Sequence, residues 1–319
     1  MSNRRCIFVV LATLAIFMVA QSAWASDVWT FGSANSNWSD SLNWAGSTVP
    51  NLDGDTADFS YDIVTAGVDD FVDVDAGVDP LTIGHLIFDD TGTAGDTSWI
   101  VNDTTTTAVG FTLADTTGTA SRPSITTTVN ATINSKLIGT QGFDKLGGAQ
   151  LILTADNSTP TLTGDINISA GTVVFGSGTN LGAVDGGGVP TNVLRMTGGG
   201  GVRYTGTADQ TLNTIDQASF NGNLESTAGR LVIDQDLVST SIGTLRAGGP
   251  GGGTLQLAAG RTFTMPGNVS FDGDWGAGGV PGINVEILGN LNSGGYASGL
   301  YIGTAVTASG TAAIVHRDG

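Results

Sequence analysis

The fold is decided by the stretch Gly148-Ala149-Gln150-Leu151-Ile152-Leu153, in which a glycine and a spacer precede alternating apolar residues. The same pattern recurs as Gly171-Thr172-Val173-Val174-Phe175, as Gly229-Arg230-Leu231-Val232-Ile233 and as Gly253-Thr254-Leu255-Gln256-Leu257. Apolar residues that recur with a period of two are typical of a strand with one buried face. The sequence therefore predicts a repetitive all-β protein.

The spacing between copies indicates which all-β fold this is. Leu151 and Val173 lie 22 residues apart, Val173 and Leu194 lie 21 apart, and Leu231 and Leu255 lie 24 apart. A step of about 20–25 residues suits one coil of a β-solenoid, which needs two or three short strands and their corners. We predict a right-handed parallel β-solenoid with degenerate repeats. An antiparallel sandwich or a propeller, which also contain many short strands, is the alternative.

The N-terminus has the three parts of a cleaved secretory signal. Two arginines precede an uncharged, mainly apolar run over 6–20, and Ala23-Trp24-Ala25 is a small-x-small cleavage site. The apolar run is shorter than the roughly 20 residues of a membrane span, although an uncleaved N-terminal anchor is the alternative. We expect residues 1–25 to be a signal peptide cut between Ala25 and Ser26. The mature chain would then be secreted or held at the cell surface without a membrane span.

The mature chain is strongly acidic and rich in turn formers. Loss of Arg4 and Arg5 leaves nine basic residues against 29 acidic ones, a formal charge of −20. All the acids except Glu225 and Glu286 are Asp, which favours turns over helices. This charge argues against nucleic acid as a partner, because phosphate binding requires clustered Lys and Arg. The only cysteine, Cys6, leaves with the signal, so no disulfide holds the mature fold.

One repeat copy resembles a known family. The copy begins Gly142-Phe143-Asp144-Lys145-Leu146-Gly147-Gly148 and continues through the strand over 150–153, an Asn-containing turn and Thr163-Gly164 to Ala170-Gly171-Thr172-Val173. This resembles the autotransporter-associated β-strand repeat, with Phe143 in place of the usual Leu and Ala149-Gln150 in place of a single Thr. The clear copy spans 142–182. The resemblance implies a bacterial secreted or cell-surface β-helical passenger and implies no enzyme activity.

We divide the mature chain into an aromatic N-terminal cap block, 26–61, and a β-solenoid, 62–319. The block carries Trp29, Trp38 and Trp44 and looks like the opening segment of large secreted proteins with these repeats. Its tryptophans are candidates either for stacking on sugar rings or for capping the solenoid. We favour the cap, because a first coil exposes apolar core and strand edges that invite aggregation. Family members often end in a barrel or an anchor, whereas the tail here is polar, so we expect a released chain or a truncated one.

Asp53, Asp55 and Asp58 are weak candidates for holding a cofactor, as oxygen ligands of Ca²⁺. The twelve-residue calcium loop and the glycine-rich calcium nonapeptide are both missing. A turn with Asp caps explains the cluster more simply.

No catalytic residues stand out along the chain. His85 lies in an alternating apolar run, so we expect an ordinary strand residue, and no Ser-His-Asp arrangement is visible. Paired carboxylates, which glycosidases need, are too numerous here to be informative. We therefore predict a non-catalytic structural and adhesive protein with an extracellular polysaccharide or another cell surface as partner. A carbohydrate-binding surface protein is the first alternative, and a solenoid polysaccharide lyase or glycosidase is the second.

Overall fold

The computed structural model describes the chain from Ser26 onward, with gaps. The described residues are 26–61, 70–75, 81–92, 98–104, 110–118, 121–159, 161–218, 220–239, 244–247, 252–264, 270–272, 284–287, 290–292, 301–302 and 313–316. Within these ranges the helical segments are short 3₁₀ helices, η1 (Ser41–Asn43) and η3 (Gly178–Leu181). The remaining regular structure is strand, which confirms the prediction of an all-β chain. The predicted signal over 1–25 lies outside the described residues.

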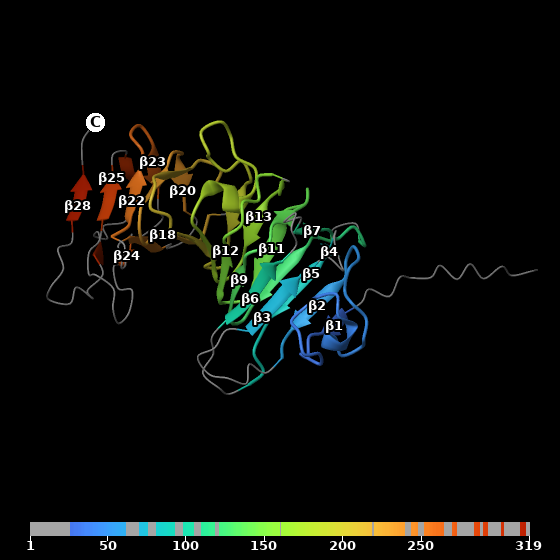
Figure 1. Cartoon of the computed structure of the whole chain (residues 1–319). Coiled ribbons are helices and arrows are strands. Elements are labelled where there is room, and N and C mark those ends of the chain that lie inside the picture. The colour runs from blue at the N-terminus through green and yellow to red at the C-terminus, as the bar shows by residue number, and fades with distance from the viewer. Residues whose placement is uncertain are drawn as a thin grey trace, which may run out of the picture.

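Two long parallel sheets run through the molecule (Figure 1). The seven-stranded sheet consists, in spatial order, of β1 (Ser26–Val28), β2 (Thr56–Phe59), β5 (His85–Phe88), β8 (Ser124–Thr127), β11 (Phe143–Leu146), β13 (Ile166–Ile168) and β15 (Leu194–Met196). The ten-stranded sheet consists of β3 (Asp70–Val74), β6 (Ser98–Asp103), β9 (Asn130–Ile133), β12 (Gln150–Leu153), β14 (Thr172–Phe175), β16 (Gly201–Tyr204), β18 (Asn223–Ser226), β21 (Thr244–Ala247), β24 (Ser270–Asp272) and β27 (Tyr301–Ile302).

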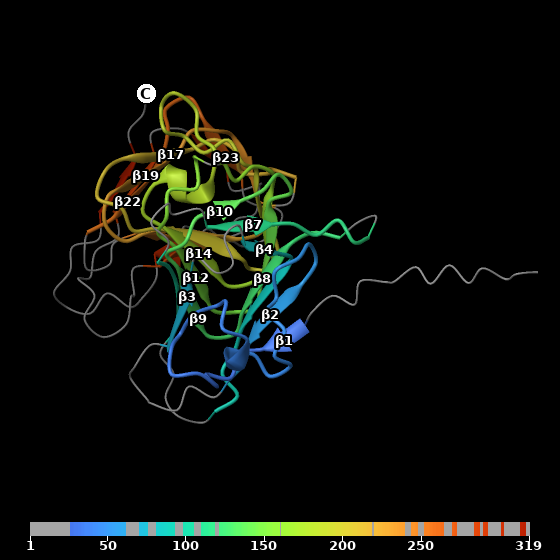
Figure 2. The same cartoon turned by 45° about the vertical axis from the view of Figure 1, so that its right-hand side comes forward.

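Three shorter sheets lie beside the long ones (Figure 2). The first contains β4 (Leu81–Ile83), β7 (Phe111–Leu113) and β10 (Leu137–Ile138). The second contains β17 (Gln210–Leu212), β19 (Arg230–Ile233), β22 (Thr254–Leu257), β25 (Asn284–Ile287) and β28 (Ala313–His316). The third contains β20 (Leu237–Val238), β23 (Thr262–Thr264) and β26 (Asn290–Asn292). In all five sheets the described strand pairs run parallel and follow chain order, which is consistent with stacked solenoid coils.

The pairing register confirms two of the predicted repeat steps and corrects the third. Leu151 pairs with Val173 and Leu231 pairs with Leu255, as their spacing indicated. Val173, however, pairs with Val202 and not with Leu194, which begins a strand of the other long sheet. The cause is an inserted loop over 183–193, closed by a bridge between Val184 and Pro190, which lengthens this coil. A constant step cannot anticipate such an insertion.

Alternation along each strand fills the interior. In β12, Leu151 and Leu153 are buried while the residues between and before them are partly exposed. Parallel pairing then stacks Leu153 on Phe175 and Phe175 on Tyr204, so each apolar side chain continues a row from coil to coil. Each buried Leu or Phe contributes about 1.5–3 kcal/mol.

Two glycines of the repeat copy are required by the close approach of neighbouring coils. Gly142 and Gly147 have φ of 65° and 75°, in the left-handed region that favours glycine. A Cβ at Gly142 would collide with the carbonyl oxygen of Asp165, and one at Gly147 with that of Thr127. The glycine positions of the motif therefore allow one coil to lie directly against the next.

Buried amide side chains join the corners of adjacent coils. The side-chain amide of Gln235 accepts a hydrogen bond from the backbone N–H of Ile215 (2.7 Å) and donates one to the carbonyl of Ile215 (2.7 Å). The amide thus makes the two hydrogen bonds that a neighbouring strand would make. Asn157 accepts from the N–H of Leu137 (2.7 Å) and donates to the carbonyl of Asn180 (2.5 Å). These side chains satisfy backbone groups where the ladders of the sheets are interrupted.

The block over 26–61 covers the first strand edge of three sheets. An uncovered edge presents unpaired N–H and C=O groups that invite aggregation. The covered edges are those of β1, β3 and β4. Their partners in the block are the segments around residues 43–45, 36–38 and 51, in that order. The bonds are Ala45 N–H to the Val28 carbonyl (2.9 Å), Trp38 N–H to the Asp73 carbonyl (2.8 Å) and Thr82 N–H to Asn51 Oδ1 (2.8 Å).

Candidate functional site

A row of polar side chains crosses the outer face of the seven-stranded sheet. Because side chains alternate along a strand, residues in register on adjacent parallel strands line up on one face. The row, hereafter the polar row, consists of Ser26, Thr56, His85, Ser124, Asp144, Asn167 and Arg195. All are at least partly exposed, whereas the positions beside them in each strand point into the core.

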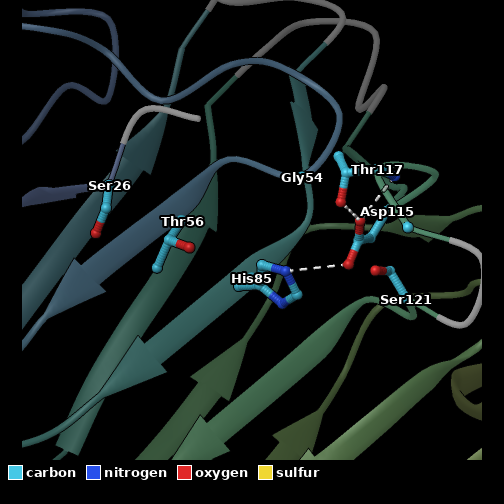
Figure 3. A pocket seen from close by; sticks show the side chains of 8 residues that line it. Ser26, Gly54, Thr56, His85, Asp115, Thr117 and Ser121 are labelled. Atoms are coloured by element: carbon cyan, nitrogen blue, oxygen red, sulfur yellow. Dashed lines mark hydrogen bonds and ion pairs between the residues drawn. The ribbon is translucent and has the colours of Figure 1, made fainter. Parts of the chain in front are cut away.

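The first part of the polar row borders a pocket of about 400 Å³. Figure 3 shows its walls, with His85 on strand β5 directed toward Asp115 on the loop after β7. The lining residues are Ser26, Gly54, Thr56, His85, Asp115, Thr117, Gly118 and Ser121. Hydroxyls, a carboxylate and an imidazole thus converge on one small cavity.

His85 links two polar partners at this pocket. Its Nε2 lies 3.2 Å from Oδ2 of Asp115, and its Nδ1 lies 2.9 Å from Oγ of Ser124. A neutral imidazole donates from one nitrogen and accepts at the other, so Nε2–H to Asp115 and Ser124 O–H to Nδ1 satisfy both. The structure thus brings Ser124, His85 and Asp115 into contact, although no Ser-His-Asp arrangement is visible along the sequence.

Burial and hydrogen bonds hold the carboxylate of Asp115 in place beside His85. Its side chain is 5% exposed, against 29% for His85. Oδ1 accepts from the N–H of Thr117 (3.1 Å) and from the hydroxyl of the same residue. Burial with three donors keeps the carboxylate fixed and directs His85 along the pocket wall.

In this arrangement the serine that contacts His85 lies outside the pocket. A serine nucleophile must face the bound substrate and have oxyanion donors beside it. Ser124 is a lateral strand neighbour of His85 and is not part of the pocket lining. Ser121, which does line the pocket, has no described hydrogen bond to His85. The pocket offers hydrogen-bond donors and acceptors to a small polar ligand.

The second part of the polar row is a lattice of paired charges. Oδ1 of Asp144 accepts from Nε of Arg122 (3.0 Å) and from Nδ2 of Asn167 (2.7 Å). Nε of Arg195 donates to Asp165 (2.9 Å), and this hydrogen bond raises the pKa of the guanidinium. Such partly exposed pairs stabilise the fold little. They place carboxylate, amide and guanidinium groups side by side on the outer face.

The three candidate tryptophans are buried in the cap block. Trp29, Trp38 and Trp44 have relative exposures of 0%, 0% and 1%. The ring of Trp44 meets those of Trp29 and Trp38 edge to face at centroid distances of 5.0 and 5.2 Å, and Phe59 packs against all three. Nε1 of Trp38 donates to the carbonyl of Pro50 (2.9 Å), and Nε1 of Trp44 to that of Trp38 (2.8 Å). These rings offer no face on which a sugar could stack.

The candidate calcium ligands are directed to separate partners. Asp53 accepts from the N–H (2.8 Å) and hydroxyl of Thr116, and Asp55 accepts from the N–H of Asn51 (3.0 Å). Asp58 lies on the outer face of β2. Within the ranges that the structure describes, no three His, Cys, Asp or Glu side chains gather as a metal group.

Of the expected cleavage site, Ser26 is the first described residue and begins β1, whereas Ala25 lies outside the described residues. In the described part of the chain, no helix has the length and apolar character that crossing a membrane requires.

Sequence reasoning missed Asp115, Ser121 and Ser124. Ser124 is 39 residues from His85, and only the register of β5 with β8 makes them neighbours. The outward position of His85 in its alternating strand was the one available signal.

A comparison with protein families, curated proteins and solved structures finds no match to this chain.

Proposed function

We propose that this chain is a secreted or cell-surface structural and adhesive protein, a right-handed β-solenoid that acts without catalysis. The observation that carries the proposal is the unbroken parallel pairing of successive coils in the two long sheets. Backbone ladders of this kind resist bending and extension along the stack, because every coil is hydrogen-bonded to the next. Crossover connections between parallel strands of one sheet are nearly always right-handed, which supports the proposed winding.

Export and surface location rest on the sequence. The N-terminal segment has the parts of a secretory signal, and the repeat over 142–182 resembles passenger-type surface repeats. The strong acidity suits a soluble protein outside the cell. The covered strand edges at the N-terminal end support a scaffold that does not aggregate by pairing of exposed strand edges.

The polar row supports the adhesive half of the proposal. It spans seven strands that are spaced about 4.8 Å apart, so it presents a track of hydroxyl, amide, carboxylate and guanidinium groups roughly 30 Å long. A polysaccharide or a glycosylated cell surface, with repeated hydroxyls, matches such a track. Extracellular polysaccharide is therefore the partner class that we propose for the scaffold.

The proposal is tested by location and adhesion together. We expect antibodies and external protease to reach the protein on intact producing cells or in their medium, with Ser26 as the first residue by N-terminal sequencing. Beads coated with the chain should adhere to immobilised polysaccharide, and the double variant Ser124→Ala with Asn167→Ala, on the polar row, should reduce the adhering fraction several-fold. Thr132→Ala, on the outer face of the ten-stranded sheet, is the matched control and should adhere like the parent chain. A protein confined to the cytoplasm, or adhesion that both variants leave unchanged, would contradict the proposal.

A further inference from the structure

A second pocket, of about 380 Å³, lies between the cap block and the edge strand β3 of the ten-stranded sheet. It shares no residue with the pocket beside the polar row. Two aromatic rings, two hydroxyls, an amide and a carboxylate line it, from Phe31, Phe71, Ser33, Ser36, Asn35 and Asp70. Apolar walls with a few polar groups are the usual composition of a small-molecule site.

The rings of Phe31 and Phe71 supply the apolar part of the lining. Phe71 is 45% exposed, whereas Val72, the next residue of the same strand, is fully buried. Phe31 stacks on Trp99 with centroids 5.9 Å apart and planes 7° apart, and meets Tyr61 edge-on at 5.8 Å. The backbone of Phe31 has φ of 50°, a conformation that costs a non-glycine residue energy and persists only where the surroundings enforce it. The ring of Phe31 is thereby locked at the pocket.

Hydrogen bonds organise the polar wall before any ligand binds. Oδ2 of Asp40 accepts from Oγ of Ser33 (2.6 Å) and Nδ2 of Asn35 (2.9 Å), and these bonds hold the pKa of Asp40 below its usual value. Oγ of Ser36 donates to Oδ2 of Asp73 (2.5 Å). A loop already in one conformation loses little entropy on binding, which favours affinity.

We propose that this pocket binds a neutral sugar ring. A pyranose has an apolar C–H face, which suits the ring of Phe71, and an edge of hydroxyls, which suits the carboxylate of Asp70 and the hydroxyl oxygen of Ser36. The carboxylates of Asp40, Asp70 and Asp73 surround the site in a chain of net charge −18, so uronic acids and sulfated sugars are repelled. The inference goes beyond the scaffold proposal, because it assigns a defined subsite outside the polar row.

The test is calorimetric titration of the purified chain with soluble cello-, xylo-, manno- and laminari-oligosaccharides, and with oligogalacturonate as the acidic comparison. We expect at least one neutral series to bind and oligogalacturonate not to bind. Phe71→Ala should weaken binding about fivefold to tenfold, the size expected for one lost aromatic contact. Phe71→Trp, which enlarges the stacking face, should bind at least as tightly as the parent chain.

Leu146→Ala is the matched control, since Leu146 is similarly exposed (38%) on the outer face of the seven-stranded sheet, and its binding should be unchanged. Equal melting temperatures of the parent chain and Phe71→Ala would show that any loss of binding is local. Absence of binding to every neutral series, preference for oligogalacturonate, or parent-like affinity of Phe71→Ala would overturn the inference. The polar-row variants retain this pocket, so failure here is distinguishable from failure of the adhesive proposal.

Discussion

Trp38→Ala is expected to lower the free energy of unfolding by about 3–5 kcal/mol, the cost of truncating a fully buried large aromatic side chain. The ring packs against Trp44, Phe59 and Phe111 at centroid distances of 5.2–5.6 Å, and the collapse of this cluster would leave a cavity. Its Nε1–H is also the donor to the carbonyl of Pro50. Urea denaturation followed by circular dichroism measures the effect without relying on tryptophan fluorescence.

The consequence of Trp38→Ala should be concentrated at the N-terminal end. Coils in a solenoid contact only their neighbours, so loss of the cap weakens the first coils most. Amide hydrogen exchange should therefore accelerate in β2 and β5 more than in β12 and β14. Leu42→Ala, which alters an exposed (63%) side chain of the same block, should change stability by less than about 0.5 kcal/mol. Equal stability of the two variants would show that the tryptophan cluster does not act as a cap.

The second large effect is expected at Lys145, which occupies an inward position of β11 between Ile125 and Ile168 of the adjacent strands. The side chain is fully buried, and Nζ donates to the carbonyls of Leu146 (2.7 Å), Gly147 (2.8 Å) and Ala170 (3.3 Å). Burial lowers the pKa of Lys145 from 10.5 to about 8. This lysine is the one in the repeat motif, and it ties the turn of one coil to the turn of the next.

The lowered pKa of Lys145 makes stability depend on pH in a defined direction. Between pH 8 and pH 10.5 the unfolded chain retains a proton that the folded chain has lost, so stability rises with pH in this window. Relative to Lys145→Met, which has no proton to lose, the parent chain should gain about 3 kcal/mol across the window. Below pH 8 both states carry the proton and the difference should be constant.

Denaturation of the parent chain and Lys145→Met at several pH values from 6 to 10.5 gives the measurement. Subtracting the two curves removes the titration of tyrosines and of the other lysine. Parallel curves over the whole range would show that Lys145 titrates in the folded chain as it does in water. A difference that shrinks as pH rises would reverse the sign of the argument.

The coil architecture was largely predictable, because one repeat determines what its neighbours bury. Leu151 and Val173 are equivalent in sequence and adjacent in space, since the strands are parallel and the coil between them has no insertion. The same reasoning failed between Val173 and Leu194, where the loop over 183–193 adds residues that carry no strand pattern. Periodicity locates strands but does not show which insertion separates them.

Side-chain contacts between coils were not predictable from periodicity. The burial of Trp38 and Trp44 was expected from the need for a cap, whereas the aromatic lining of the second pocket comes from the partly buried Phe31 and the exposed Phe71, which no motif marks. The contact of His85 with Asp115 depends on the corner after β7 turning back over the seven-stranded sheet. Lys145 looks like any surface lysine in the sequence, and only its inward register in β11 shows that it is buried.

The central claim, that equivalent residues of successive coils lie side by side in parallel register, is tested most directly by cysteine cross-linking. Thr132 and Ile152 face outward and are register partners on β9 and β12. Paired Cα atoms on adjacent strands lie within the range that a disulfide can span, whereas Thr132 and Val174 are two strands apart and exceed it. Because Cys6 is the only cysteine of the sequence, the chain beginning at Ser26 provides a background without thiols. We predict that mild oxidation closes a disulfide in Thr132→Cys/Ile152→Cys and none within Thr132→Cys/Val174→Cys; efficient closure of the second pair, or none of the first, would contradict the coil stacking described here.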